Sequence, residues 1–120
     1  MYEVEFYYDK NGKSEIVEYL DRLGKRSETS KTDRINRNKI LAHIIGLQEY
    51  GTRIGQPTVK YIDGDIWELR PLDNRIFFFY WKDKKYVLLH HFVKKTNKTP
   101  LQEIEQARSK MKDYLERYGE

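Results

Sequence analysis

The first residues of the chain alternate between polar and apolar side chains. Within residues 2–8, Glu3 and Glu5 alternate with Val4 and Phe6, which is the two-residue period of a half-buried strand. A short polar segment with a glycine follows, as is typical of a turn. We therefore expect the chain to begin with a strand.

The pattern then changes to the period of a helix. Ser14 can cap a helix that runs to about Leu23, and Gly24 is expected to end it. Residues 25–32 are polar and are interpreted as a connection. Apolar residues then recur near 3.6-residue spacing over residues 33–50, which predicts a second, longer helix.

A sheet region comes next, and its pattern predicts two hairpins. Asp63-Gly64 is a strong signal for the first turn, and residues 83–85 supply the second. Residues 87–93 are apolar at both parities, so we expect this strand to lie inside the sheet with both faces covered. The four predicted strands are residues 58–62, 65–70, 75–82 and 86–95.

The last segment carries one continuous apolar stripe from Leu101 to Tyr118, which predicts a helix. Thr99 is its expected cap, with Pro100 in the first turn. The predicted order is β-α-α-β-β-β-β-α. This order indicates an α+β fold, in which N-terminal helices and a C-terminal helix pack on one side of a mostly antiparallel sheet.

The composition limits what kind of protein this is. A chain of 120 residues with a 38% hydrophobic fraction is expected to form a single domain, residues 1–120, with one modest core. The absence of cysteine excludes a disulfide framework and a cysteine-based zinc site. No apolar run is long enough to span a membrane, and the acidic N-terminus is unlike a signal peptide. We therefore expect a cytoplasmic protein.

The net charge of +4 is unevenly placed along the chain. Residues 1–21 hold six acids and only two lysines, whereas residues 84–98 hold five lysines, Lys98 among them, and no acid. Such asymmetry suits a surface for phosphates or an acidic partner. For any single lysine, ordinary solubility charge is the alternative explanation.

Charged side chains interrupt the predicted strands near their ends. Glu68 and Arg70 share one strand face, opposite the expected core residues Trp67 and Leu69, and are expected to face outward together. Arg75 opens the next strand. If the sheet and the following loop curl together, these cations meet lysines of the last strand in one concave patch. The further candidates there are His90 and Lys94, which share a face, and Lys95 on the other face.

Such a patch suits RNA cleavage by the 2′-hydroxyl of the RNA itself. That reaction needs a base, an acid and cations that stabilise the phosphorane, and it needs neither metal nor cofactor. Arg70, Arg75 and the Lys94-Lys95 pair could hold the phosphate, with His90 or Glu68 moving protons and Tyr61 or Tyr80 stacking on a base. His90 could equally be a hydrogen-bonded histidine near the core, and Glu68 and Arg70 a surface ion pair. The residues by themselves favour RNA binding and leave catalysis open.

Several motifs together resemble a known toxin family, the HigB-like branch of the RelE superfamily. Its members are toxins of bacterial toxin–antitoxin pairs and include many phage-derived relatives. By motif the resemblance covers roughly residues 55–110. The motifs are Trp67-Glu68-Leu69-Arg70, Arg75 at the start of a strand, Leu88-Leu89-His90-x-Phe92-x-Lys94-Lys95-Thr96 and Lys98-Thr99-Pro100-x-x-Glu103-Ile104-x-x-Ala107.

The resemblance implies a small toxin that cleaves mRNA, commonly on the translating ribosome. It also implies neutralisation by a helix-turn-helix antitoxin in a complex that is typically a heterotetramer and contacts DNA only through the antitoxin. Arg70, Arg75, Lys94 and Lys95 match positions that relatives use on RNA phosphates. Similar sequences often carry lysines where this chain has Ile66 and Glu68, and Lys60 is a possible substitute.

The general base is left open among His90, Glu68 and Lys94, with Lys60 and Lys98 as further RNA-binding candidates. The leading hypothesis is a metal-independent endoribonuclease toxin. The first alternative is a non-catalytic RNA- or ribosome-binding module with the same basic surface. The second is an interaction protein whose aromatic and basic face serves a partner only.

Overall fold

The computed structural model describes residues 1–119, so that Glu120, the last residue of the expected domain, lies outside the described part. The order of elements is the predicted one, with one additional short 3-10 helix, η1. The elements are β1 (Glu3–Phe6), α1 (Glu15–Arg26), α2 (Lys31–Tyr50), η1 (Gly51–Ile54), β2 (Val59–Asp63), β3 (Ile66–Leu69), β4 (Asn74–Tyr80), β5 (Lys85–Val93) and α3 (Leu101–Tyr118).

The strands form one five-stranded sheet in the order β1-β5-β4-β3-β2. Strands β2 to β5 pair antiparallel through the two predicted hairpins, and β1 pairs parallel with β5. The α+β class and the mostly antiparallel sheet are therefore confirmed. Strand β5 lies inside the sheet, as its apolar pattern predicted.

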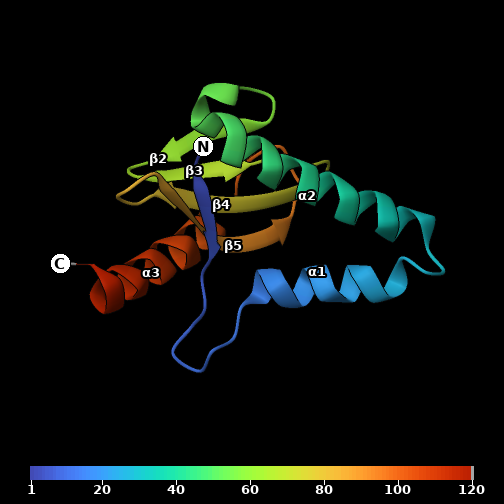
Figure 1. Ribbon diagram of the computed structural model, residues 1–120, viewed down its shortest axis with the longest axis horizontal. Helices are drawn as coiled ribbons and strands as arrows, with labels where there is room; N and C mark the ends of the chain where they lie inside the picture. The colour runs from blue at the N-terminus through green and yellow to red at the C-terminus, as the bar shows by residue number, and fades with distance from the viewer. Residues whose placement is uncertain (120) are drawn as a thin grey trace.

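Helices cover both faces of this sheet, so the expectation of helices on one side is wrong. On one face, Phe78 and Leu88 pack with Leu20 of α1 and Ile44 of α2. On the other face, Phe79 packs against Tyr114 of α3. Figure 1 shows α1 and α2 side by side on one side of the sheet and α3 on the other. The cause is that β4 and β5 are apolar at both parities, so each face needs its own cover.

Two predicted helix ends differ from the structure for local reasons. Helix α1 continues through Gly24 to Arg26. The glycine leaves room for the side chain of Arg37 on α2, since a Cβ atom there would lie only 3.1 Å from Arg37 Nε. At α3 the cap position is Pro100 rather than Thr99, and no side chain caps the helix. The capping role of Ser14 is confirmed, because its hydroxyl accepts a hydrogen bond from the backbone N–H of Val17.

A β-bulge sets the direction of the side chains at the end of β5. Phe77 pairs with His90 while Phe78 pairs with Leu88, so Leu89 is an extra residue on β5. Leu89 packs in the α3-facing cluster, and His90 contacts Glu103 of α3. Both residues therefore face α3 although they are adjacent in sequence.

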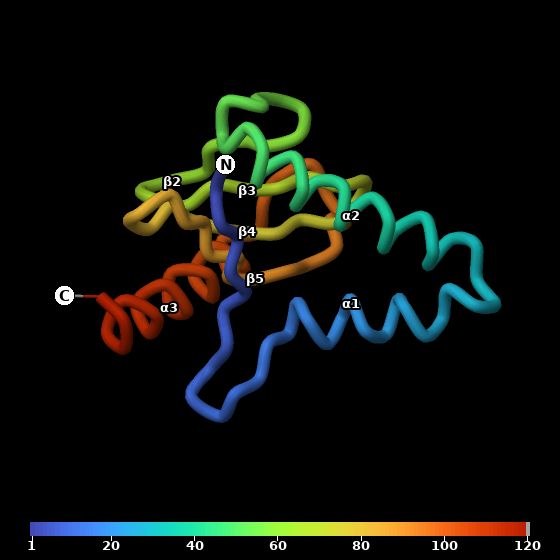
Figure 2. Tube along the Cα trace, in the orientation of Figure 1, coloured from blue at the N-terminus to red at the C-terminus, as the bar shows by residue number. Residues whose placement is uncertain are grey.

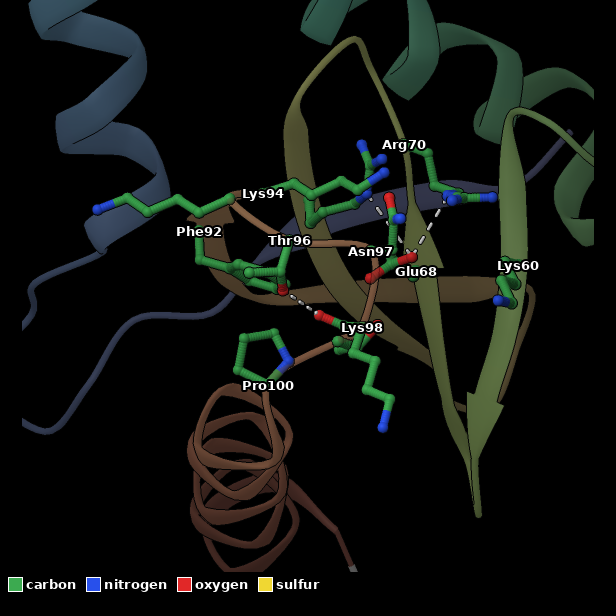
Figure 3. Close-up of a pocket in the computed structure, with 12 residues that line it drawn as sticks. Lys60, Glu68, Arg70, Phe92, Lys94, Thr96, Asn97, Lys98 and Pro100 are labelled. Carbon is green, nitrogen blue, oxygen red and sulfur yellow. Dashed lines mark hydrogen bonds and ion pairs between the residues drawn. The ribbon is translucent and has the colours of Figure 1, made fainter.

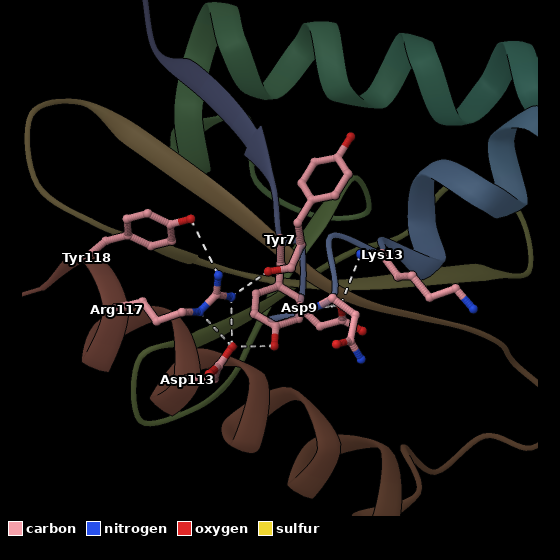
Figure 4. Close-up of polar contacts among 8 residues, drawn as sticks. Tyr7, Asp9, Lys13, Asp113, Arg117 and Tyr118 are labelled. Carbon is pink, nitrogen blue, oxygen red and sulfur yellow. Dashed lines mark hydrogen bonds and ion pairs between the residues drawn. The ribbon is translucent and has the colours of Figure 1, made fainter.

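Polar contacts hold α3 against the N-terminal strand. The Tyr7 hydroxyl donates to Asp113 Oδ2 at 2.7 Å, and Arg117 Nη2 donates to the same oxygen at 2.8 Å (Figure 4). Burial and the neighbouring Asp113 raise the pKa of Tyr7 to about 12, so the phenol stays a donor. The helix is thus fixed in place along one face of the sheet. Among the helices described within residues 1–119, none has the length and apolarity that crossing a membrane requires.

Candidate functional site

The charged strand ends and the segment before α3 enclose a hollow on the α3-facing side of the sheet. Loop 94–100 connects β5 to α3 (Figure 2). It is fixed at its start by a hydrogen bond from the Lys94 backbone N–H to the Asp73 carbonyl at 2.7 Å. The hollow contains about 330 Å³ of space not filled by protein atoms, which includes open solvent at its mouth. We call it the cationic hollow; its lining includes Lys60, Glu68, Arg70, Arg75, Lys94, Lys95 and Lys98.

Seven of the eight sequence-predicted site residues therefore lie together, although they come from β2, β3, β4 and the following segments. The reason is topological. Antiparallel pairing places Lys60 opposite Glu68, and Arg75 opposite Phe92, at one end of the sheet. The chain after Phe92 then turns back over this end before α3 begins.

Glu68 forms the floor of the cationic hollow, which corrects the expectation that it faces outward. Its side chain is only 3% exposed, and its Oε1 lies 3.4 Å from Arg70 Nε and 3.9 Å from Arg75 Nε. Figure 3 shows the carboxylate beneath the loop that carries Asn97, with Arg70 beside it. Within residues 1–119, Glu68 Oε2 and Arg70 Nε are buried without a hydrogen-bond partner.

The backbone holds Arg75 in a fixed position. Its Nη1 donates to the carbonyl of Leu72 at 2.7 Å and to that of Asn74 at 2.8 Å. Burial, followed by the charge of Arg70, lowers the pKa of Arg75, but a guanidinium keeps its proton in proteins. Arg75 is therefore a fixed positive charge at the floor of the hollow, while Arg70 lies nearer its opening.

Burial and the neighbouring cations have opposite effects on the pKa of Glu68. Burial raises the pKa of its carboxyl above the ordinary value, whereas Arg75, Arg70, Lys60 and Lys94 act in the opposite direction. A carboxylate with a raised pKa is a stronger base than one in water. The hollow therefore combines a proton acceptor with cations that suit a phosphate.

The structure places His90 outside this hollow. His90 is 3% exposed and lies under α3, where its Nε2 is 2.7 Å from Glu103 Oε1 and its Nδ1 is 2.8 Å from Lys110 Nζ. A carboxylate accepts and an ammonium donates, so His90 is the neutral tautomer with its proton on Nε2. Burial lowers its pKa, which agrees with that state. Its position matches the alternative explanation, a hydrogen-bonded histidine near the core.

Other residues differ from their predicted places or were missed. Tyr61 is exposed and bonded to the Gly64 carbonyl, and Tyr80 is half exposed; neither lines the cationic hollow. Asn97 and Thr99 do line it. The only signal for them in the sequence is their position between Lys95 and the start of the last predicted helix. Within residues 1–119, no group of three or more histidine, aspartate or glutamate side chains is arranged to hold a metal ion.

Comparison with protein families identifies a match. The family described as phage-derived protein Gp49-like (DUF891) matches residues 18–112. This segment runs from α1 into α3 and includes every predicted site residue. None of the curated proteins matches the chain.

Proposed function

Because the chain belongs to the phage-derived Gp49-like family, which is a RelE/HigB-like toxin family, we propose that it is the toxin of a type II toxin–antitoxin system and acts as a metal-independent endoribonuclease on mRNA. The observation that carries the proposal is the arrangement in the cationic hollow. A buried carboxylate with one unpartnered oxygen lies between two arginines, and four lysines line the same space.

The proposed reaction is transfer of the phosphodiester to the neighbouring 2′-oxygen. Glu68 Oε2 takes the proton of the 2′-hydroxyl, the 2′-oxygen forms a bond to phosphorus, and the bond to the 5′-oxygen breaks. Lys94 donates a proton to that leaving oxygen, which gives a 2′,3′-cyclic phosphate and a 5′-hydroxyl. Arg75 and Arg70 stabilise the phosphorane, a role worth about 10²–10³-fold for one well-placed donor in other enzymes.

In this proposal RNA must open the floor of the hollow. The side chain of Glu68 is almost fully covered, and the exposed Asn97 lies next to it in Figure 3. Asn97 belongs to a connecting loop, which is the kind of segment that moves when a ligand binds. The incoming phosphate therefore displaces Asn97 and reaches the two arginines.

The proposed partners follow from the same class of protein. The toxin acts in the cytoplasm on mRNA, on the translating ribosome. A helix-turn-helix antitoxin neutralises it in a heterotetramer and supplies all contact with DNA. A neighbouring reading frame that encodes such a protein would support this part of the proposal, and copurification of the two chains would test it.

The activity is tested by inducible expression of the wild-type protein and of the Arg75→Ala and Lys94→Ala variants. Wild-type protein should stop growth, and primer extension on cellular mRNA should reveal new 5′ ends. Both variants should relieve growth arrest while staying folded. Arg53→Ala is the matched control, because it removes the same charge from an exposed position outside the hollow.

Two outcomes would contradict the proposal. Stalled ribosomes without new 5′ ends would indicate the alternative, a non-catalytic RNA- or ribosome-binding module. Normal growth with abundant folded wild-type protein and no antitoxin would contradict both.

A further inference from the structure

A second hollow lies directly beside the cationic hollow, on the α1 side of loop 94–100. The two share Phe92, Lys95, Thr96 and Pro100 in their linings. The second hollow extends from these residues to α1 and the end of β5. We call it the stacking hollow, because Tyr19, Arg22 and His91 line it in addition.

Tyr19 and His91 form a preassembled aromatic pair in the stacking hollow. Their rings stack with centroids 4.0 Å apart and planes 26° from parallel. The Tyr19 hydroxyl and His91 Nε2 each lie 3.0 Å from Asn74 Oδ1, and both donate to it. Asn74 is itself 2% exposed and is fixed by hydrogen bonds from its Nδ2 to Asn36 Oδ1 and to the Pro71 carbonyl. The pair is therefore rigid before any ligand arrives.

The charges in the lining of this hollow favour nucleic acid. Exposed Arg22 and Lys95 lie there, and among residues 1–119 Glu103 is the one acid in the lining. Glu103 is already bound to His90. Burial is the main cause that lowers the pKa of His91 to about 4, so its ring is neutral at pH 7 and adds no charge of its own.

We propose that the stacking hollow binds the base of the nucleotide next to the one held in the cationic hollow, with Tyr19 as the stacking surface and Arg22 as a phosphate contact. This inference rests on the proposed function and adds a second subsite to it. The shared Lys95 lies between the two hollows, where the connecting phosphate of a continuous strand passes.

Arg22 supports the inference by its present position. Its guanidinium carbon lies 5.9 Å from the centroid of the Tyr19 ring. A cation–π contact of an exposed arginine is weak, whereas stacking of a base on an aromatic ring is stronger and tolerates any base. A base therefore displaces Arg22 from the ring and leaves the guanidinium free to pair with a phosphate.

The test uses short RNAs with the full-length protein. A 2′-deoxynucleoside 3′,5′-bisphosphate, which fills the cationic hollow alone and cannot be cut, is compared with two forms extended by one 2-aminopurine nucleotide, at either the 5′ or the 3′ end. One extended form should bind about tenfold more tightly than the bisphosphate, a gain of the size expected for one stacked base. The 2-aminopurine fluorescence of that form should be quenched.

Three variants locate the effect. Tyr19→Phe keeps the ring and should keep both the gain in affinity and the quenching. Tyr19→Leu should lose both while it binds the unextended bisphosphate as the wild type does. Arg22→Glu, at an exposed position that folding tolerates, should lose most of the gain and serves if Tyr19→Leu does not fold.

The outcomes separate this inference from the proposed function. Binding of the bisphosphate without a gain from either extension overturns the stacking subsite alone. A gain that survives in both Tyr19→Leu and Arg22→Glu also overturns it, and a simultaneous loss of antitoxin binding would then assign this surface to a protein partner. Failure of every RNA to bind overturns the proposed function and the subsite with it.

Discussion

Two buried polar clusters lie on the same face of the sheet, and they differ in how completely their atoms are paired. One is the cluster of Glu68, Arg70 and Arg75, and the other is His90 with Glu103 and Lys110. Both ring nitrogens of His90 have partners at hydrogen-bond distance. In the first cluster, Glu68 Oε2 and Arg70 Nε make no hydrogen bond within residues 1–119, although Arg70 Nε forms an ion pair with Glu68 Oε1 at 3.4 Å.

Under the proposed function, this difference separates a structural cluster from a functional one. Buried polar groups in folded proteins are nearly always hydrogen-bonded, so an unpaired group indicates a bound water, ion or ligand, a strained site or a catalytic role. Helix α3 covers His90 and supplies its partners, whereas the helix begins only after Pro100 and leaves Glu68 beneath a loop. The residue at which α3 begins therefore determines that a helix covers the His90 cluster, whereas only a loop covers the Glu68 cluster.

The largest expected effect comes from Glu68→Gln, which keeps the shape of the side chain but removes its basicity. Cleavage of a model RNA at pH 7 should fall about 10²–10⁴-fold, the range that general base catalysis contributes. Single-turnover rates with the purified variant would measure this. A loss of less than about threefold would remove Glu68 from proton transfer and leave His90 and Lys94 as the candidates for the base.

The stability of the Glu68→Gln variant provides a control for its activity. Because burial raises the pKa of Glu68 in the folded state, its contribution to stability is present below its ordinary pKa of 4.5 and is lost as pH rises through the folded value. Glu68→Gln removes that loss. Its free energy of unfolding relative to wild type should therefore increase from pH 4 to pH 7, while its activity falls.

His90→Gln should have the opposite signature. It breaks a fully paired cluster, and we expect a loss of about 2–4 kcal/mol in the free energy of unfolding. Cleavage by the protein that is still folded should stay within about twofold of wild type, because His90 lies outside the cationic hollow. Chemical denaturation and cleavage rates on one sample would measure both. If the His90→Gln variant is as stable as the wild type but cleaves RNA slowly, His90 would again be a candidate for the general base.

His91 extends the comparison to the opposite face of the sheet. Its pKa is lowered from 6.5 to about 4, first by burial, so it contributes stability above pH 6.5 that is lost as pH falls toward 4. The loss is on the order of 3 kcal/mol, at 1.36 kcal/mol for each pKa unit. Unfolding free energies measured from pH 7 to pH 4 should show this slope, and His91→Gln should flatten it. An unchanged slope would mean that His91 is protonated at no greater cost in the folded state.

The gathering of the cations could be predicted from the sequence for a physical reason. Arg70, Arg75 and Lys94 stand at strand ends, and antiparallel pairing brings neighbouring strand ends together. Turn residues and hydrophobic periods are local signals, and they were sufficient to define the two hairpins. The meeting of Arg70 and Arg75 with the start of the segment after β5, at one end of the sheet, follows from these signals.

The burial of the candidates could not be predicted, because it depends on contacts between distant segments. A two-residue period shows that Glu68 faces away from Leu69, but not that loop 94–100 covers that face. Whether His90 belongs to the site likewise depends on where α3 lies on β5. The bulge at Leu89 also interrupts the simple alternation of strand faces.

The smallest expected effect comes from the outer edge of the His90 cluster. Glu15 Oε2 lies 3.4 Å from Lys110 Nζ, but the Glu15 side chain is 64% exposed, so water screens the pair. Glu15→Ala should lower the free energy of unfolding by less than about 1 kcal/mol, and 0.5 M salt should reduce the difference. Its place in the first turn of α1 adds a helix-dipole contribution, which a double-mutant cycle with Lys110→Met separates from the ion pair. A coupling energy between Glu15 and Lys110 above about 2 kcal/mol would contradict this expectation. Glu15 would then belong to the buried His90 cluster rather than to its solvent-exposed edge.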